Sequence, residues 1–237
     1  MSHERREIDL DGRRVSYLLR RSARASRLGL RIELRRGLSV TLPEGMDEAS
    51  VEPFVRARRR WVLRILRRYD RLAPLIPDRA LAHGTTVPFL GRQLTLNLCI
   101  GAPRVGRLGD SLVVHVPRRA KATVRRALVE WYFREAEREL IERAVALAAR
   151  HGLTYRKIVV GDQKSRWGTC YQNGTISFNW RLMLAPEEVA NYLVAHELAH
   201  RAVPNHSPKF WAKVEELCPA YRDHERWLRR FGPSLVL

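Results

Sequence analysis

Short stretches of alternating hydrophobic and polar residues dominate the first half of the chain, and such alternation is typical of β-strands with one buried face. The strands that it predicts are residues 14–20, 28–34, 38–42, 87–90, 94–100 and 112–116. Arg35-Arg36-Gly37 and Gly91 stand between neighbouring strands, where they predict hairpin turns. We therefore expect an N-terminal region that is rich in β-structure.

One helix interrupts these strands, because hydrophobic residues recur at helical spacing from about residue 50 to 72. Its other face is basic. The arginines of that face are Arg56, Arg58, Arg59, Arg60, Arg64, Arg67, Arg68 and Arg71. Pro74 and Pro77 are expected to end the helix.

The second half of the chain is predicted to be mainly helical. A long helix covers residues 123–150 and ends at His151-Gly152, where we expect a glycine C-cap. The elements expected after it are a strand at 157–160, a hairpin of 166–171 and 175–180 turned at Asn173-Gly174, a helix from Pro186 to about 202 and a helix that Ser207 caps.

A domain boundary is expected at residues 117–121, between the strands and the long helix. Residues 1–118 would form a basic, β-rich subdomain with the helix near 50–72. Residues 119–237 would form a second domain. The predicted fold class is α+β.

The formal net charge of the chain is +19, with 39 Arg, 5 Lys and 25 acidic residues. Both halves are basic, with +12 in residues 1–118 and +7 in residues 119–237. A positive surface attracts polyanions such as nucleic acid or nucleotides. A genome rich in G and C would also favour arginine over lysine, so charge alone does not establish such a partner.

Three widely spaced cysteines, Cys99, Cys170 and Cys218, indicate neither a disulfide framework nor a cysteine zinc site. The charged first residues do not resemble a secretory signal, and no stretch is long and apolar enough to cross a membrane. We therefore expect a cytoplasmic protein with no membrane partner.

The segment His196-Glu197-Leu198-Ala199-His200 carries the main candidate chemistry. Residues four apart lie one turn apart on the same side of a helix, so two neutral imidazoles there can share one zinc ion at about 2.0–2.1 Å. Glu197 is displaced from that side and is placed to take a proton from the metal-bound water. The helix around it is apolar on nearly all sides, and a buried glutamate needs a partner or a function.

His206 is the predicted third ligand. Pro204 should end the helix, and a reversal of the chain there would bring His206 back to the metal. The spacing from first to third histidine is that of HExxHxxGxxH proteases, although Val203 replaces the glycine and no Met-turn methionine follows. Zinc is the expected cofactor, and other divalent metals could also fill a site of imidazoles.

The chain resembles the YgjP-like metallopeptidase-domain family, relatives of the SprT-like zincins. The segments that carry the resemblance are His196–His200, Pro204-Asn205-His206-Ser207, Phe210-Trp211, residues 164–170 and 179–182 and, more loosely, Arg20-Arg21-Ser22 and Trp61. Thr169 stands where that family is expected to have serine. The resemblance implies a zincin-like catalytic domain with His196, His200 and His206 as metal ligands and Glu197 as general base. It implies no particular substrate.

Residues 166–170 offer two further candidates. Arg166 could stabilise negative charge that develops during the reaction, or it could fix a turn. Cys170 is interpreted as a small buried residue, and Trp167, Trp180 and Trp211 as packing residues that wall the site.

The site is compatible with several functions. Peptide-bond hydrolysis is the first. Hydrolysis of a phosphoanhydride such as a nucleoside triphosphate is the second, since cationic residues assist phosphoryl transfer. A nucleic-acid-associated SprT-like protease that docks through the arginine-rich helix is the third. A metal-stabilised protein without turnover is the fourth, although three histidines leave a coordination position open for water.

Overall fold

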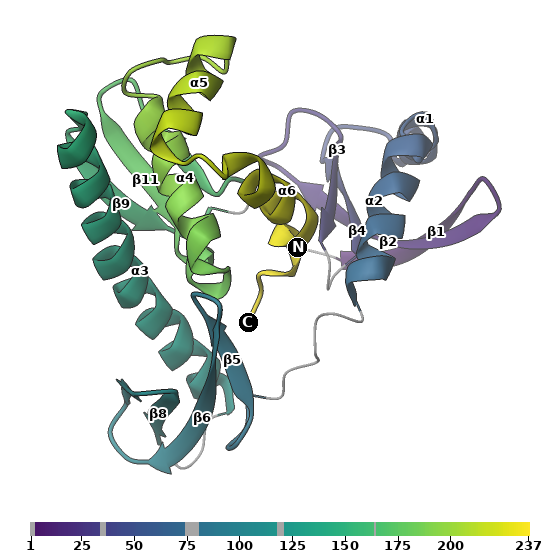
Figure 1. Cartoon of the computed structure of the whole chain (residues 1–237). Helices are drawn as coiled ribbons and strands as arrows, with labels where there is room; N and C mark the ends of the chain where they lie inside the picture. The colour runs from purple at the N-terminus through teal and green to yellow at the C-terminus, as the bar shows by residue number, and fades with distance from the viewer. Residues whose placement is uncertain (1–2, 34–36, 74–80, 118–120, 164) are drawn as a thin grey trace. The chain divides into compact units, whose positions relative to one another are not determined.

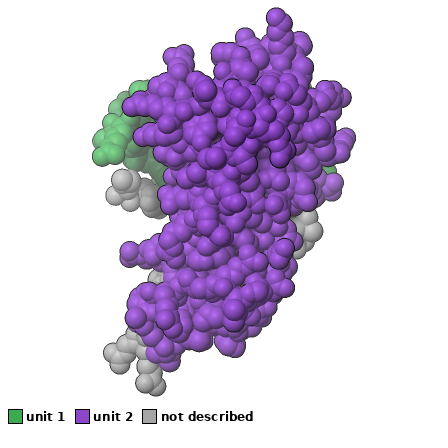
Figure 2. Space-filling model, turned by 60° about the vertical axis from the view of Figure 1, so that its left-hand side comes forward, with its two compact units in different colours: residues 1–77 green, residues 78–237 purple. Residues whose placement is uncertain are grey.

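The computed structural model describes residues 3–33, 37–73, 81–117, 121–163 and 165–237. Its contacts divide the chain into two compact units, Met1–Pro77 and Asp78–Leu237, which Figure 2 colours separately. Parts of three predicted features lie outside the described residues. They are Arg35 and Arg36 of the first turn, Pro74 and Pro77 at the expected helix end, and residues 118–120 of the domain boundary. Both units combine helices with a sheet, so the architecture is mixed α and β, as predicted.

Unit 1 is a four-stranded sheet with helices packed on it (Figure 1). Its strands are β1 (His3–Leu10), β2 (Arg13–Ser22), β3 (Gly29–Glu33) and β4 (Gly37–Pro43), in the order β1-β2-β4-β3. β2 and β4 are parallel, and the two outer pairs are antiparallel. The sequence pattern does not predict β1, because most of its residues are charged. Its buried apolar residues are only Ile8 and Leu10.

The helix expected over residues 50–72 is broken in two. A 3-10 turn (Glu48–Ser50) leads into α1 (Val51–Ala57), and α2 (Arg59–Leu72) follows. At the break, a guanidinium N–H of Arg58 donates to the Phe54 carbonyl at 3.2 Å, which would otherwise accept the backbone N–H of Arg58. The backbone N–H of Arg58 bonds instead to Val55 O at 3.0 Å, and Arg58 leaves the helical conformation.

Unit 2 contains two sheets and a set of helices. The first sheet has β5 (Thr86–Phe89), β6 (Arg92–Ile100), β7 (Arg104–Leu108) and β8 (Ser111–Val116) in the order β5-β6-β8-β7, and the second has β9 (Lys157–Gly161), β10 (Gly168–Cys170) and β11 (Thr175–Asn179) in the order β10-β11-β9. The helices are α3 (Lys121–His151), α4 (Glu187–Ala199), α5 (Pro208–Leu217) and α6 (Tyr221–Phe231), with short 3-10 helices at Trp180–Leu184 and Gly232–Ser234.

The helix α3 runs along unit 2, with one sheet near each of its ends (Figure 1). It ends as predicted, since Gly152 has a φ of 63° and the N–H of Leu153 bonds to Ala148 O at 2.9 Å. Within the described residues, no helix has both the length and the apolar character that crossing a bilayer requires.

The units divide at residues 77/78, whereas the sequence predicted a boundary at residues 118/119. The β5–β8 sheet shares one hydrophobic core with α3 and α4, and Leu90 N–H bonds to Met183 O at 2.8 Å. The hydroxyl of Tyr132 on α3 donates to the carbonyl of Pro88 in β5. This sheet therefore packs with the residues that follow it. Periodicity identifies a strand without showing which later helix will cover it.

A core substitution in the β5–β8 sheet should therefore destabilise α4. We expect Leu96→Ala to lower the free energy of unfolding by about 2–5 kcal/mol, because Leu96 is fully buried in the shared core. Hydrogen exchange of the α4 amides should accelerate accordingly. Leu38→Ala, the same substitution in the core of unit 1, is the control. Unchanged α4 exchange in Leu96→Ala would support the boundary at 118/119.

Candidate metal centre

The helix α4 is buried on nearly every side, as its sequence predicted. Val194, Ala195, Leu198 and Ala199 are at most 1% exposed. It packs against α3, α5, α6 and β10. Glu197 is only 4% exposed, which makes it a buried charged residue in an otherwise apolar helix.

The structure brings the three predicted histidines together. Their ligand atoms lie within 4.8 Å of one another, and Nε2 of His196 and Nε2 of His206 are 3.2 Å apart. The helix ends at Ala199, earlier than expected, because the N–H groups of Arg201 and Ala202 bond back three residues in a tight turn. His206 then follows Pro204 and Asn205, just before α5 begins.

Ring nitrogens of the three histidines lie at a spacing that one metal ion could bridge. Nδ1 of His200 lies 3.3 Å from the Val203 carbonyl, so this nitrogen carries the proton and leaves Nε2 free to coordinate. Two nitrogens on one tetrahedral zinc at about 2.0–2.1 Å would be about 3.3 Å apart, close to the His196–His206 distance. The residues present therefore fit a single divalent ion.

Burial favours the neutral form of His196 and His200. Desolvation, followed by the neighbouring His200 and His206, lowers the pKa of His196 to about 3. Burial also lowers the pKa of His200. Neutral imidazoles at physiological pH are the form that a metal requires.

Aromatic rings surround the histidines. Phe210 of α5 stacks on His200, with ring centroids 4.3 Å apart, and Trp211 lies 5.8 Å from both His196 and His206. Trp211 thus walls the site as predicted. Trp180, by contrast, packs in the core against Tyr132 at 5.8 Å, and Trp167 packs against Gly232.

Glu197 lies against the strand β10. A Cβ added to Gly168 would stand 2.4 Å from Oε1 of Glu197, so the strand passes the carboxyl as closely as a glycine allows. The backbone N–H of Cys170 donates a hydrogen bond to the carboxylate. Burial raises the pKa of Glu197 to about 8, which this hydrogen bond partly opposes. A cation held by the adjacent histidines would lower that pKa again.

Two polar residues for which the sequence predicted no particular role bond to backbone carbonyls in this region. Nε of Arg201 donates to Thr154 O at 2.9 Å, and its guanidinium also bonds to the thiol of Cys170. The amide of Asn179 donates to the carbonyls of Gln163 and Arg166, at 2.6 and 3.1 Å. Arg201 is one of many arginines, so the sequence offers no signal for it.

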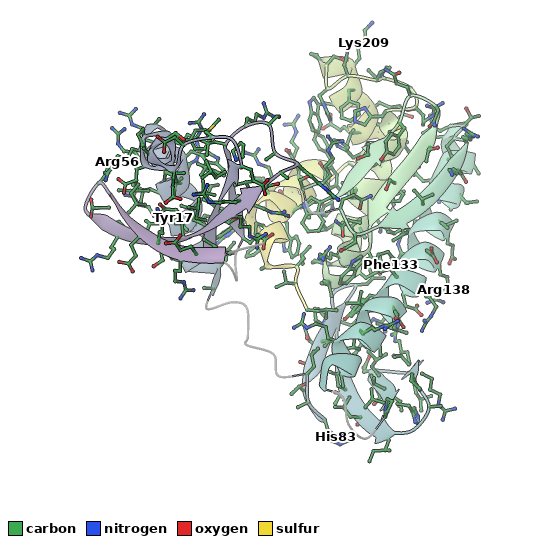
Figure 3. The ribbon with its side chains drawn as sticks, turned by 180° about the vertical axis from the view of Figure 1, so that it is seen from behind. Tyr17, Arg56, His83, Phe133, Arg138 and Lys209 are labelled. Carbon is green, nitrogen blue, oxygen red and sulfur yellow. The ribbon has the colours of Figure 1, made fainter. Side chains whose placement is uncertain are left out.

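The candidate Arg166 and a histidine that was not predicted to be a ligand, His83, lie outside this cluster. The side chain of Arg166 is exposed, and among the described residues no hydrogen bond or ion pair joins it to Glu197 or to the histidines. Its charge-stabilising role stays a prediction. His83 accepts the N–H of Leu98 at 3.2 Å. Lys209 lies at the start of α5, and His83 lies at the opposite end of unit 2 from it (Figure 3).

A family comparison agrees with this chemistry. Residues 26–231 match the family model described as YgjP-like, metallopeptidase domain. No curated protein matches the chain. One solved structure, the metallopeptidase zymogen of Pyrococcus abyssi abylysin, is 21% identical and aligns with a TM-score of 0.36 over 39% of this chain and 95% of that chain.

Zinc should stabilise the folded protein through the three histidines. At a free concentration a thousandfold above the dissociation constant, a ligand that binds only the native state adds about 4 kcal/mol. We expect zinc to raise the unfolding temperature of the metal-free wild type and to have little effect on His206→Ala. His83→Ala removes a histidine outside the cluster and should respond like the wild type. A full zinc response in His206→Ala would exclude it as a ligand.

Gly168→Ala should disturb Glu197 while sparing the histidines. The added methyl group would collide with the carboxyl, so either the glutamate or β10 must move. We expect hydrolytic activity to fall by about tenfold or more, with the zinc content unchanged by elemental analysis. Gly106→Ala is the control, because a Cβ there meets nothing within 4 Å. Equal activity in both variants would contradict the close contact.

Proposed function

We propose that this chain, which belongs to the YgjP-like metallopeptidase-domain family, hydrolyses peptide bonds at a zinc site formed by His196, His200 and His206, with Glu197 as general base. Its family makes it a metallopeptidase. The zinc identity, the zincin-like arrangement and the roles of the four residues are our proposal. The position of Glu197, buried beside three histidines with its carboxyl against β10, is the observation that supports it.

A divalent ion bound there would act as a Lewis acid, polarising a carbonyl and lowering the pKa of a coordinated water to about 7. The protein's own residues supply the remaining chemistry. Glu197 takes the proton from the attacking water and passes it to the leaving amine. The N–H of Cys170 holds the carboxylate in one orientation, and Gly168 leaves room for it.

The surroundings of the histidines favour a peptide over a nucleotide. The rings that contact them belong to Phe210, Trp211 and Tyr192. Phe210 and Tyr192 are buried, so Trp211 is the ring that can meet a substrate. It can accommodate an apolar side chain, whereas a triphosphate would need cationic groups around the metal. Phosphate release from a panel of nucleoside triphosphates tests the alternative. Turnover there that depends on Glu197, with no peptide cleaved, would replace our proposal.

Glu197→Gln should separate metal binding from catalysis. The amide keeps the size of the carboxyl but cannot accept the proton, so we expect hydrolysis to fall by about 10²–10⁴-fold. Zinc content should remain that of the wild type. Cleavage of a fluorescent protein substrate and elemental analysis provide the two readouts.

Glu188→Gln is the matched control, because Glu188 lies on the same helix and is exposed. It should cleave like the wild type. If Glu197→Gln kept both its zinc and its full activity, the general base would have to be another group. If it lost zinc, Glu197 would be needed for metal binding as well.

A further inference from the structure

An open groove of about 770 Å³ is formed entirely by residues of unit 1. One wall is the start of β3 with the residues before it, and the other is the end of α1 and the beginning of α2. The lining residues are Arg27, Leu28, Gly29, Leu30, Met46, Phe54, Arg58 and Trp61. Neither the histidines nor Glu197 belongs to it.

The strand wall of the groove is a sheet edge. In the described part of unit 1, β3 pairs only with β4, so its other side can accept a further strand. At the far end of β3, the hydroxyl of Tyr69 donates to Ile32 O at 3.4 Å. Gly29 and Leu30, the residues of β3 that line the groove, are therefore where an extended chain could pair with this strand.

The groove is apolar along its floor. Leu28, Leu30 and Met46 pack partly against the core of unit 1, and Trp61 is 37% exposed. Alternate side chains of an added strand point to the same face, so every second residue of a bound peptide could place an apolar side chain here.

Two cations of the groove have no acidic partner. Arg56 and Arg59, which flank Arg58 on the helices, pair with Glu52 and Asp11. The guanidinium of Arg58 instead stacks on the ring of Phe54 at 3.7 Å. Among the described residues, no carboxylate lies within ion-pair distance of Arg27 or Arg58. Acidic groups on a ligand would complement both.

We propose that this groove binds an extended peptide segment whose groove-facing side chains, at every second position, include both apolar and acidic residues. The segment adds to the free edge of β3, its apolar side chains pack near Met46 and Trp61, and its carboxylates pair with Arg27 and Arg58. Single-stranded nucleic acid would also use arginine and tryptophan. It would make no use of the backbone groups of an edge strand, so the combined features favour a peptide.

Binding is measured by fluorescence anisotropy on the full chain carrying Glu197→Gln, so that the readout does not depend on whether the metal centre cleaves peptides. The probe is a labelled peptide of about seven residues, enough to span β3, in which glutamate and leucine share the alternate positions that face the groove and serine fills the positions between them. We expect saturable binding that Arg27→Gln with Arg58→Gln weakens about tenfold. Arg60→Gln with Arg67→Gln removes the same charge outside the groove and should change affinity less than about twofold.

A second probe tests the strand pairing. The same peptide methylated at alternate backbone nitrogens keeps its side chains and loses its donors to β3, and it should bind about tenfold more weakly. Equal affinity for both peptides would overturn the proposal. So would no saturable binding, or equal losses in the groove and control variants. A deoxythymidine oligonucleotide that binds more tightly than the peptide, and only with Arg27 and Arg58 intact, would assign the groove to nucleic acid instead.

Discussion

The contact between Glu197 and β10 is the constraint on which the candidate centre depends. The carboxyl fills the space beside Gly168 where a Cβ would stand, and it accepts the N–H of Cys170. A helix can approach a strand this closely only at a glycine. Burying an ionisable group costs free energy, as the raised pKa of Glu197 shows. A cation bound by the neighbouring histidines would offset that cost, so the pocket and its metal are energetically coupled.

Local spacing explains how much of this centre could be predicted from the sequence. His196 and His200 share a face because they are four residues apart on a helix, and that relation holds whatever the helix packs against. His206 required only a chain reversal after Pro204. The same reasoning places most strands and the end of α3 at Gly152, since alternation and glycine caps act within a few residues. Where the determinants are local, sequence and structure agree.

The remaining features depend on partners that are far apart in the chain. Arg201 reaches Thr154 across 47 positions, and no spacing rule distinguishes it from other arginines. The division at residues 77/78 likewise reflects which core the β5–β8 sheet joins. Tertiary packing decides each of these outcomes.

Some of the many arginines pair with acidic residues and join elements within the same unit. Arg13 pairs with Asp70, joining β2 to α2, and Arg143 bonds to Glu139 and Glu187, joining α3 to the start of α4. Exposed pairs of this kind add at most about 1 kcal/mol each, whereas the half-buried Arg143 is screened less by solvent. Part of the positive charge therefore serves contacts within each unit. Recognition of an anionic partner is better judged from where guanidinium groups without a carboxylate gather than from the net charge of the chain.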